Sequence, residues 1–217
     1  MTYIIAEIGI NHDGHIKNAK KMIIGASSAG VNAIKFQYRN LKRSYHKNSK
    51  QLGDEMIKSE IKKNYLSVSK IISLSRFAKK LKLDVGISFF LKDDFYDFSD
   101  HKYFDFYKVP SVEFNNDDLI KKLLKSKKKV FASLGCQNEL AIRESIKKYS
   151  NYNKFIYLHC VSNYPLASHN CNLGYIKYFQ DKYKKPIGYS SHDEDWKMII
   201  IAVAYGAEII ERHITLG

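Results

Sequence analysis

The sequence YIIAEIGINHDGHIKNAKKMIIGASSAGVNAIKFQ, residues 3–37, places two apolar runs on either side of an amphipathic segment. The first run, residues 3–9, and the second, residues 33–37, have the apolar and β-branched content typical of buried strands. Residues 16–26 carry apolar side chains at helical spacing, and Gly30 is a stop signal for that helix. This strand–helix–strand order predicts two parallel strands joined by a helix.

The same alternation continues along the chain. Six further apolar runs that suit strands occupy residues 84–89, 105–109, 129–134, 155–160, 186–190 and 207–213. Helical periodicity separates most of them and is clearest over residues 66–81, 138–149 and 196–205. Eight strands in regular alternation with helices predict an α/β fold, a (β/α)8 TIM barrel, rather than an open doubly wound sheet.

The pattern also predicts how the chain is divided. No linker rich in Pro, Gly or Ser interrupts it, so residues 1–217 are expected to form one domain. Only four residues follow the run at 207–213, so we expect the barrel to lack its last helix. Because helices normally cover the outer face of a parallel strand, we expect either a neighbouring chain, as in a homodimer, or a longer form of the protein to cover it.

The charge of the chain is strongly positive. Lys and Arg number 36 against 22 Asp and Glu, a formal charge of +14, but only five of the 36 are Arg. Proteins that read nucleic acids rely on Arg for bidentate contacts. Lysines are instead dispersed over helix-like segments such as residues 121–129. A solvated surface is therefore favoured over a nucleic-acid partner, which stays the alternative.

Three cysteines and the absence of long apolar stretches limit the cellular setting. Cys136, Cys160 and Cys171 form no CxxC pair, which favours a reducing cytoplasm over a disulfide framework. Cys136 and Cys160 are expected to be small core residues. No stretch approaches the roughly 18 apolar residues of a membrane span, and the N-terminus lacks the basic region of a signal peptide.

Polar residues gather where the predicted strands end, and those ends form the active-site face of a TIM barrel. They comprise Glu7, residues 11–14, Lys35, Gln37, Lys108, Ser111, Glu113, Ser133, Ser162, Tyr164, residues 190–192, Glu211 and His213. Lys35, Lys108 and Glu7 are the most informative, because an unpaired charge inside a strand is costly. Lysines and serines suit a phosphate, carboxylates suit proton transfer, and two histidines suit a divalent metal.

Several of these stretches resemble one enzyme family. The matching segments are residues 5–14 (IAEIGINHDG), 33–37 (AIKFQ), 107–113 (YKVPSVE), 133–135 (SLG), 158–165 (LHCVSNYP), 188–192 (GYSSH) and 211–216 (ERHITL). In this order they resemble the catalytic barrel of the N-acetylneuraminate (sialic acid) synthase family, which includes legionaminic acid, pseudaminic acid and spore-coat sugar synthases.

The resemblance implies a reaction and a set of residue roles. The family condenses phosphoenolpyruvate with an N-acylated sugar such as N-acetylmannosamine, giving a nine-carbon 2-keto sugar acid and phosphate, with Mn²⁺ or alternatively Mg²⁺ or Co²⁺. The implied metal ligands are His192 and His213. The implied phosphoenolpyruvate-binding residues are Lys35, Lys108, Ser111, Ser133, Ser162 and Ser190. The sugar and the reacting carbons would be faced by Glu7, Gln37, Glu113 and Tyr164. The implied catalytic residues are Glu7, Glu113, Lys35 and Lys108.

This chain departs from the family pattern in three places. Residues 88–91 read SFFL where the family has S-T-P-F, and Ser191 replaces the Asp beside the metal histidine. The family's C-terminal antifreeze-like domain and the loop after the eighth strand are absent from the sequence. A second hypothesis is therefore a truncated barrel, weakly active or inactive, that needs a partner chain.

Overall fold

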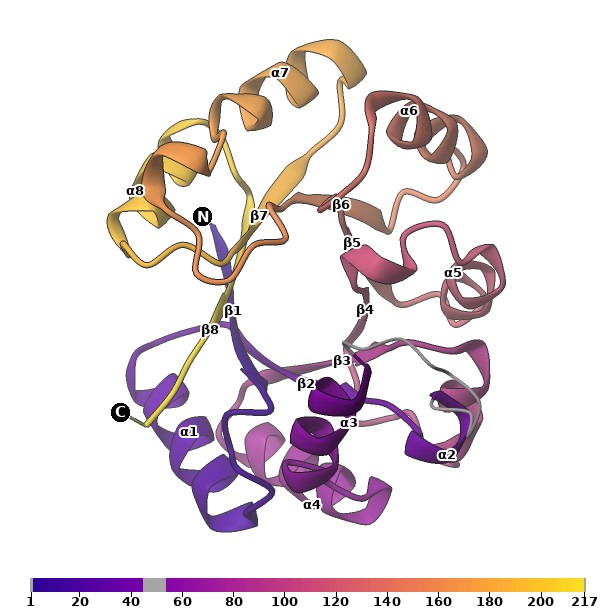
Figure 1. Cartoon of the computed structure of the whole chain (residues 1–217), viewed down its shortest axis with the longest axis vertical. Coiled ribbons are helices and arrows are strands. Elements are labelled where there is room, and N and C mark those ends of the chain that lie inside the picture. The colour runs from indigo at the N-terminus through magenta and orange to yellow at the C-terminus, as the bar shows by residue number, and fades with distance from the viewer. Residues whose placement is uncertain (1, 45–53, 217) are drawn as a thin grey trace.

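The computed structural model describes residues 2–44 and 54–216, and side chains are described outside residues 45–58. Eight parallel strands close into a barrel in the order of the sequence, with β1 paired to both β2 and β8 (Figure 1). The strands are β1 Tyr3–Gly9, β2 Ala33–Tyr38, β3 Asp84–Phe89, β4 Phe106–Val109, β5 Lys129–Ser133, β6 Phe155–His159, β7 Ile187–Ser191 and β8 Ile209–His213. The predicted (β/α)8 barrel is confirmed, with strand ends shifted by at most two residues.

Helices surround the strands on the outside of the barrel (Figure 1). They are α1 Ile16–Ser28, α2 Leu41–Ser44, α3 Asp54–Lys63, α4 Val68–Lys80, α5 Asp117–Leu124, α6 Glu139–Lys148, α7 Gly174–Tyr183 and α8 Lys197–Ala204. Short 3₁₀ turns are η1 Lys92–Asp97, η2 Ser111–Glu113 and η3 Ser168–Asn170. No helix of the described ranges is long and apolar enough to cross a membrane.

The interior of the barrel is filled at its N-terminal end by apolar side chains. These are Ile5, Ala33, Phe106, Phe131, Leu158 and Ile209, each at most 6% exposed. Gly86 leaves room for Phe106, since a Cβ there would lie 2.0 Å from the ring. Because side chains two residues apart in a strand share a face, the next inward positions stand above this apolar layer. Those positions include Glu7, Lys35, Lys108, Ser133 and Glu211.

Two local expectations were wrong. The lysine-rich residues 121–129 are only partly helical, because α5 ends at Leu124 and Lys129 already begins β5. Cys136 is exposed rather than in the core, on a left-handed turn with φ +59°, whereas Cys160 is buried as predicted. No helix follows β8 among the residues described up to position 216.

Candidate active site

Four charged side chains lie together above the apolar layer, and we call them the floor charges: Glu7, Lys35, Lys108 and Glu211. Each is 1 to 6% exposed. Lys35 contacts the Glu7 carboxylate, and its Nζ lies 3.7 Å from Glu211 Oε2. Lys108 Nζ lies 2.6 Å from Glu211 Oε1. Two ammonium groups are thus balanced by two carboxylates.

Glu211 is the hub of the floor charges. Burial opposes its ionisation, but attraction by Lys108 and Lys35 outweighs burial and lowers the pKa of Glu211 to about 2. Burial likewise opposes the charge of Lys35, yet the two carboxylates raise its pKa. The pKa of Lys108 is lowered, because burial and the neighbouring Lys35 exceed the attraction of Glu211. Ser190 Oγ donates to Glu211 Oε1 at 3.0 Å and Lys35 Nζ donates to Ser88 Oγ at 2.8 Å.

The floor charges open into a space of about 290 Å³, which we call the mouth cavity. Its lining includes all four predicted serines, Ser111, Ser133, Ser162 and Ser190. Ser133 Oγ is buried and has no hydrogen-bond partner among the described residues. A Cβ at Gly135 would lie 2.0 Å from Ser162 Oγ and 2.6 Å from Ser111 Oγ, so glycine is needed for these hydroxyls to sit where they do.

A larger cavity of about 930 Å³ lies outside the strands, lined by residues of β6, α6 and α7. It shares Cys160 and Ser162 with the mouth cavity. None of its described lining residues is Lys or Arg, whereas the mouth cavity is lined by Lys35, Lys108 and Arg39. An anionic substrate therefore favours the mouth cavity.

The two predicted metal ligands line the mouth cavity: His192 directly follows β7, and His213 is the last residue of β8. The ring centroids of His192 and His213 are 6.1 Å apart. His192 Nδ1 donates to the Val161 carbonyl at 3.0 Å, which leaves Nε2 as an acceptor, and Nε2 accepts from Tyr164 Oη at 2.6 Å. Burial lowers the pKa of both histidines, so both imidazoles are neutral near pH 7. Gly9, at φ +54°, lies against the His213 ring, where a Cβ would approach to 3.1 Å.

These features fit a divalent ion. A carbonyl that fixes the imidazole tautomer is typical of metal-binding histidines. Three or more His, Cys, Asp or Glu side chains grouped for a metal do not occur in residues 2–44 and 59–216. An ion held by His192 and His213 would therefore keep several positions for substrate and water.

A network that the sequence did not reveal supports the His192 loop. Asp193, whose side chain is fully buried, accepts hydrogen bonds from Tyr189 Oη at 2.7 Å, Ser191 Oγ at 2.6 Å and Arg212 at 3.0 Å. Burial opposes its ionisation, but these three donors lower the pKa of Asp193. Ser191, which stands where the family has Asp, thus hydrogen-bonds to a carboxylate two residues later. The sequence signal was Asp193 directly after His192.

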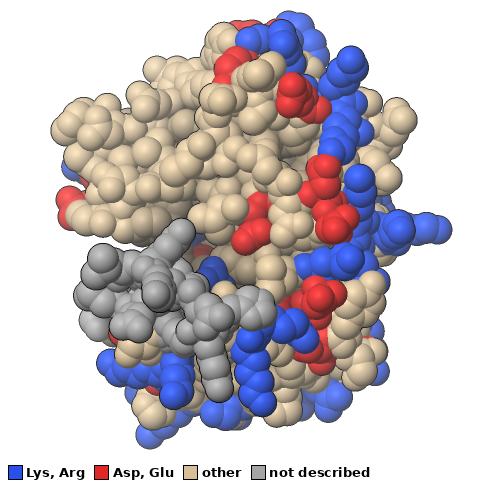
Figure 2. Space-filling model, turned by 45° about the vertical axis from the view of Figure 1, so that its right-hand side comes forward, with Lys and Arg blue, Asp and Glu red and all other residues tan. Residues whose placement is uncertain are grey.

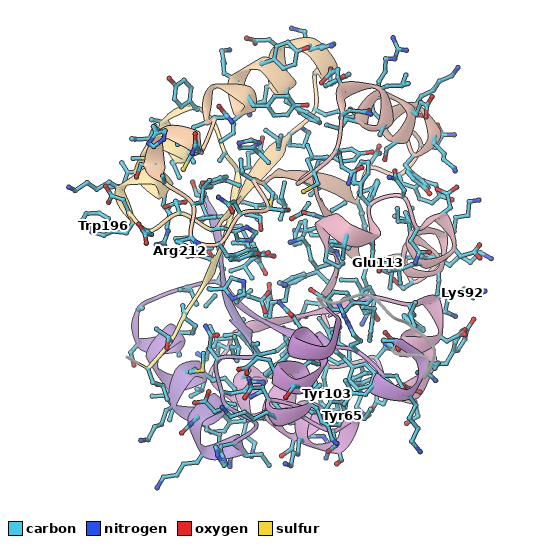
Figure 3. All side chains as sticks on the ribbon, in the orientation of Figure 1. Tyr65, Lys92, Tyr103, Glu113, Trp196 and Arg212 are labelled. Carbon is cyan, nitrogen blue, oxygen red and sulfur yellow. The ribbon has the colours of Figure 1, made fainter. Side chains whose placement is uncertain are left out.

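The remaining predicted residues fall into two groups. Gln37 and Tyr164 line the mouth cavity, and Tyr164 is 64% exposed. Glu113, which is labelled in Figure 3, does not line it. η2 places this half-buried residue beside Asn116, whose Nδ2 donates to it at 2.8 Å. Burial raises the pKa of Glu113, while Asn116 and Arg39 partly offset the rise.

Comparisons with known proteins extend over nearly the whole chain. The sequence matches the NeuB family over residues 22–217. It is 31% identical to the N,N'-diacetyllegionaminic acid synthase of Campylobacter jejuni and 32% identical to the human N-acetylneuraminate-9-phosphate synthase, each over 99% of this chain. The structure superposes on the sialic acid synthetase of Leptospira borgpetersenii with a TM-score of 0.90 and 30% identity, covering 100% of this chain and 74% of that one.

The chain covers only part of the length of each of these relatives. This chain spans 68% of the C. jejuni synthase and 62% of the human one. The superposition on the L. borgpetersenii structure nevertheless covers the whole chain and therefore all eight strands of the barrel. The chain belongs to the NeuB family.

Proposed function

We propose that this chain condenses phosphoenolpyruvate with an N-acylated sugar to give a nine-carbon 2-keto sugar acid and phosphate. The observation that carries the proposal is the mouth cavity, which is lined by two buried lysines, by the imidazoles of His192 and His213, and by Ser133, whose hydroxyl has no hydrogen-bond partner in the described part of the chain. The lysines and the hydroxyl suit a phosphorylated carboxylic acid, and the imidazoles suit a metal-bound acceptor.

Binding of phosphoenolpyruvate is assigned to the floor lysines and the serines around them. Lys35 and Lys108 would neutralise much of its negative charge, and Ser111, Ser133, Ser162 and Ser190 would donate to its oxygens. All six of these residues line the mouth cavity. Preorganised donors of this kind hold a substrate in a near-attack position without reorganising during the reaction.

The acceptor sugar is assigned to the two histidines and to Tyr164, Gln37 and Glu7, which also line the mouth cavity. His192 and His213 would hold Mn²⁺, or Mg²⁺ or Co²⁺, and such an ion polarises a carbonyl as a Lewis acid. Tyr164 Oη, which donates to His192 Nε2, would turn toward the sugar when that nitrogen is used. Gln37 and Glu7 would contact the sugar hydroxyls.

The bonding changes set the roles of the carboxylates. C3 of phosphoenolpyruvate bonds to the aldehyde carbon, and the aldehyde oxygen takes up a proton to become a hydroxyl. Water adds to C2 and gives up a proton, and the bond from C2 to the bridging oxygen then breaks, so that phosphate leaves with that oxygen and C2 becomes the ketone. Glu7 lies in the mouth cavity and can take or orient the proton of that water. Glu113, whose pKa burial raises, is the second candidate base and would act from the rim.

The test is phosphate release by the 217-residue chain with phosphoenolpyruvate, Mn²⁺ and N-acetylmannosamine, against an EDTA control and with the product's mass recorded. His213→Ala should abolish metal-dependent release, whereas His169→Ala, an exposed histidine of η3, should not. A His213→Ala variant with wild-type turnover would refute the metal assignment. Absence of release with every N-acyl sugar supplied would refute the reaction.

A second candidate is a barrel that is inactive until a partner chain completes it, or until a homodimer forms. The chain matches its curated relatives over 60 to 68% of their length. Release that appears only above a threshold protein concentration would support a homodimer. Full activity in a monomer would refute this candidate.

The setting proposed is the cytoplasm, supported by three cysteines that are all free. The positive charge does not favour a nucleic-acid partner. Figure 2 shows one face of the molecule, where lysines and arginines form a band along one edge and acidic side chains lie beside them. Such mixed charge is typical of a solvated surface.

A further inference from the structure

Arg39 is a cation of the mouth cavity to which the proposed reaction gives no role. It follows β2 directly and lines the same cavity as Lys35 and Gln37, its neighbours at every second position. At a rise of about 3.3 Å per residue, its backbone lies about 13 Å beyond that of Lys35. β2 and the residue that follows it thus provide three polar side chains to the mouth cavity, with Lys35 at the floor, Gln37 next and Arg39 farthest out.

Phe90 holds the guanidinium of Arg39 in place. The charge centre of Arg39 lies 3.8 Å from the centroid of the Phe90 ring, within the range of a cation–π contact. Phe90 belongs to the SFFL segment, where it replaces the Pro of the family's S-T-P-F pattern. The SFFL segment therefore has a structural role that the sequence did not suggest: its Phe90 fixes the side chain of Arg39 at the mouth cavity.

The backbone on both sides of Arg39 is fastened as well. Tyr38 Oη donates to Asp97 at 2.7 Å, and Asn40 Nδ2 donates to the same carboxylate at 2.9 Å. The backbone N–H of Asn40 donates to Asp94 Oδ1 at 3.2 Å. A side chain that is stacked on a ring and carried by a fastened segment loses little entropy on binding, which is what a recognition residue requires.

A small side chamber next to Arg39 shows what kind of group fits. It has a volume of about 70 Å³ and is lined by Gln37, Arg39, Phe90 and Asn64, among others. Asn64 is 3% exposed, and its Oδ1 has no hydrogen-bond partner among the described residues. The chamber therefore offers the Arg39 guanidinium as a donor and Asn64 Oδ1 as an acceptor. A hydroxyl-bearing end of a sugar could accept a hydrogen bond from the first and donate one to the second.

We propose that Arg39, held by Phe90, is a specificity-determining residue that binds the oxygen-bearing end of the acceptor sugar, distant from its aldehyde. The group that Arg39 binds would be a sugar hydroxyl or a phosphate ester, and in both cases an oxygen accepts a hydrogen bond from the guanidinium. The inference rests on the proposed function, since it assumes an acceptor whose aldehyde lies near His192 and His213.

The test measures binding separately from turnover. Titration calorimetry with N-acetylmannosamine and with N-acetylmannosamine 6-phosphate is run on the wild type, Arg39→Gln and Arg39→Lys. Arg76→Gln is the matched control, because Arg76 is exposed on α4 and also lies over a ring, that of Tyr103, at 5.0 Å. Arg39→Gln should weaken sugar binding about tenfold or more, a loss expected for a hydrogen bond to a charged group. Arg39→Lys should recover part of it, and Arg76→Gln should change nothing.

The two sugars distinguish the sources of the oxygen. A loss confined to the 6-phosphate identifies a phosphate ester, and an equal loss with both sugars identifies a hydroxyl. In turnover, the KM for the sugar should rise about tenfold while the KM for phosphoenolpyruvate stays unchanged.

Several results would overturn the proposal: wild-type affinity for both sugars in Arg39→Gln, no binding of either sugar by the wild type, or a parallel rise in the KM for phosphoenolpyruvate. Sugar binding through Arg39 without phosphate release would instead refute the condensation and support this inference.

Discussion

The charge of Glu211 can be removed with little change of shape by Glu211→Gln. In the wild type, Glu211 Oε1 lies 2.6 Å from Lys108 Nζ, and both side chains are at most 7% exposed. The variant keeps the volume but leaves the Lys108 ammonium without the carboxylate that balances it. We expect a large loss of stability from this single replacement.

Two independent estimates of the loss in the free energy of unfolding agree. Removing one partner of a buried ion pair typically costs about 3–5 kcal/mol. A carboxyl whose pKa falls from 4.5 to about 2 on folding contributes about 3 kcal/mol of stability at neutral pH. Since a domain has about 5–15 kcal/mol in total, the variant should fold but unfold at much lower urea.

The pH dependence follows from the direction of the shift. The pKa of Glu211 is lower in the folded state, so its contribution is fully present above pH 4.5 and is lost as pH falls toward 2. The difference in stability between wild type and variant should therefore narrow over that interval.

The assay is urea unfolding at pH 7 of four proteins: wild type, Glu211→Gln, Lys108→Met with Glu211→Gln, and the control Glu208→Gln. Glu208 is exposed and precedes β8, so its replacement should change stability by less than about 0.5 kcal/mol. The double variant buries neither charge and should regain most of the loss. If Glu211→Gln were as stable as the control, or if the double variant were less stable than Glu211→Gln, the assignment of Glu211 as hub of the floor charges would be wrong.

Three further variants test other contacts. Ser133→Ala removes a buried hydroxyl that has no described partner, so stability should change by less than about 1 kcal/mol while the KM for phosphoenolpyruvate rises about tenfold; an unchanged KM would exclude this hydroxyl from the site. Gly135→Ala places a Cβ 2.0 Å from Ser162 Oγ and should raise the same KM without changing the affinity for Mn²⁺ measured by calorimetry. Asp193→Asn weakens the Arg212 ion pair and should cost about 2–3 kcal/mol in urea unfolding at pH 7, a difference that shrinks as pH falls below 3.8 because the pKa of Asp193 is lowered; a constant difference down to pH 2 would contradict the ion pair.

The fold could be predicted from the sequence because strand and helix periodicities alternate without interruption. Strand ends were less predictable, since they depend on turns. Residues 207–213 are one apolar run, but β8 begins only at Ile209. The Ala207 amide bonds back to Ala202 and the Glu208 amide bonds to Ile187, so the first two residues belong to the turn after α8.

The floor of the site was predictable for a topological reason. In a closed parallel barrel, the inward residues of alternate strands form common layers and all strand ends meet at one mouth, so Lys35 on β2 and Lys108 on β4 were expected to lie near other strand-end side chains. Their pairing with Glu211 was not predictable, because it depends on the register between strands and on side-chain packing. Glu211 was recognised as a strand-end residue but received no role.

The rim was the part that sequence reasoning could not place. Pro110 ends β4, and η2 then turns the chain with about three residues per turn. Ser111 and Glu113, two residues apart, therefore point to different sides, and only Ser111 lines the mouth cavity. The contact between Arg39 and Phe90 joins two loops that are distant in sequence, and no local pattern signals it.

The floor carboxylates raise an apparent conflict, because Glu7 and Glu211 would repel an anionic substrate. Burial alone, however, drives a lysine toward its neutral form. The pKa of Lys108 is lowered even with Glu211 at 2.6 Å, so without that carboxylate the amine would lose its proton still more readily. A neutral amine cannot neutralise a phosphate. The carboxylates thus favour the charged form of both lysines, and their repulsion of the substrate is offset by the serine donors, among them the Ser133 hydroxyl, which has no partner among the residues that the structure describes.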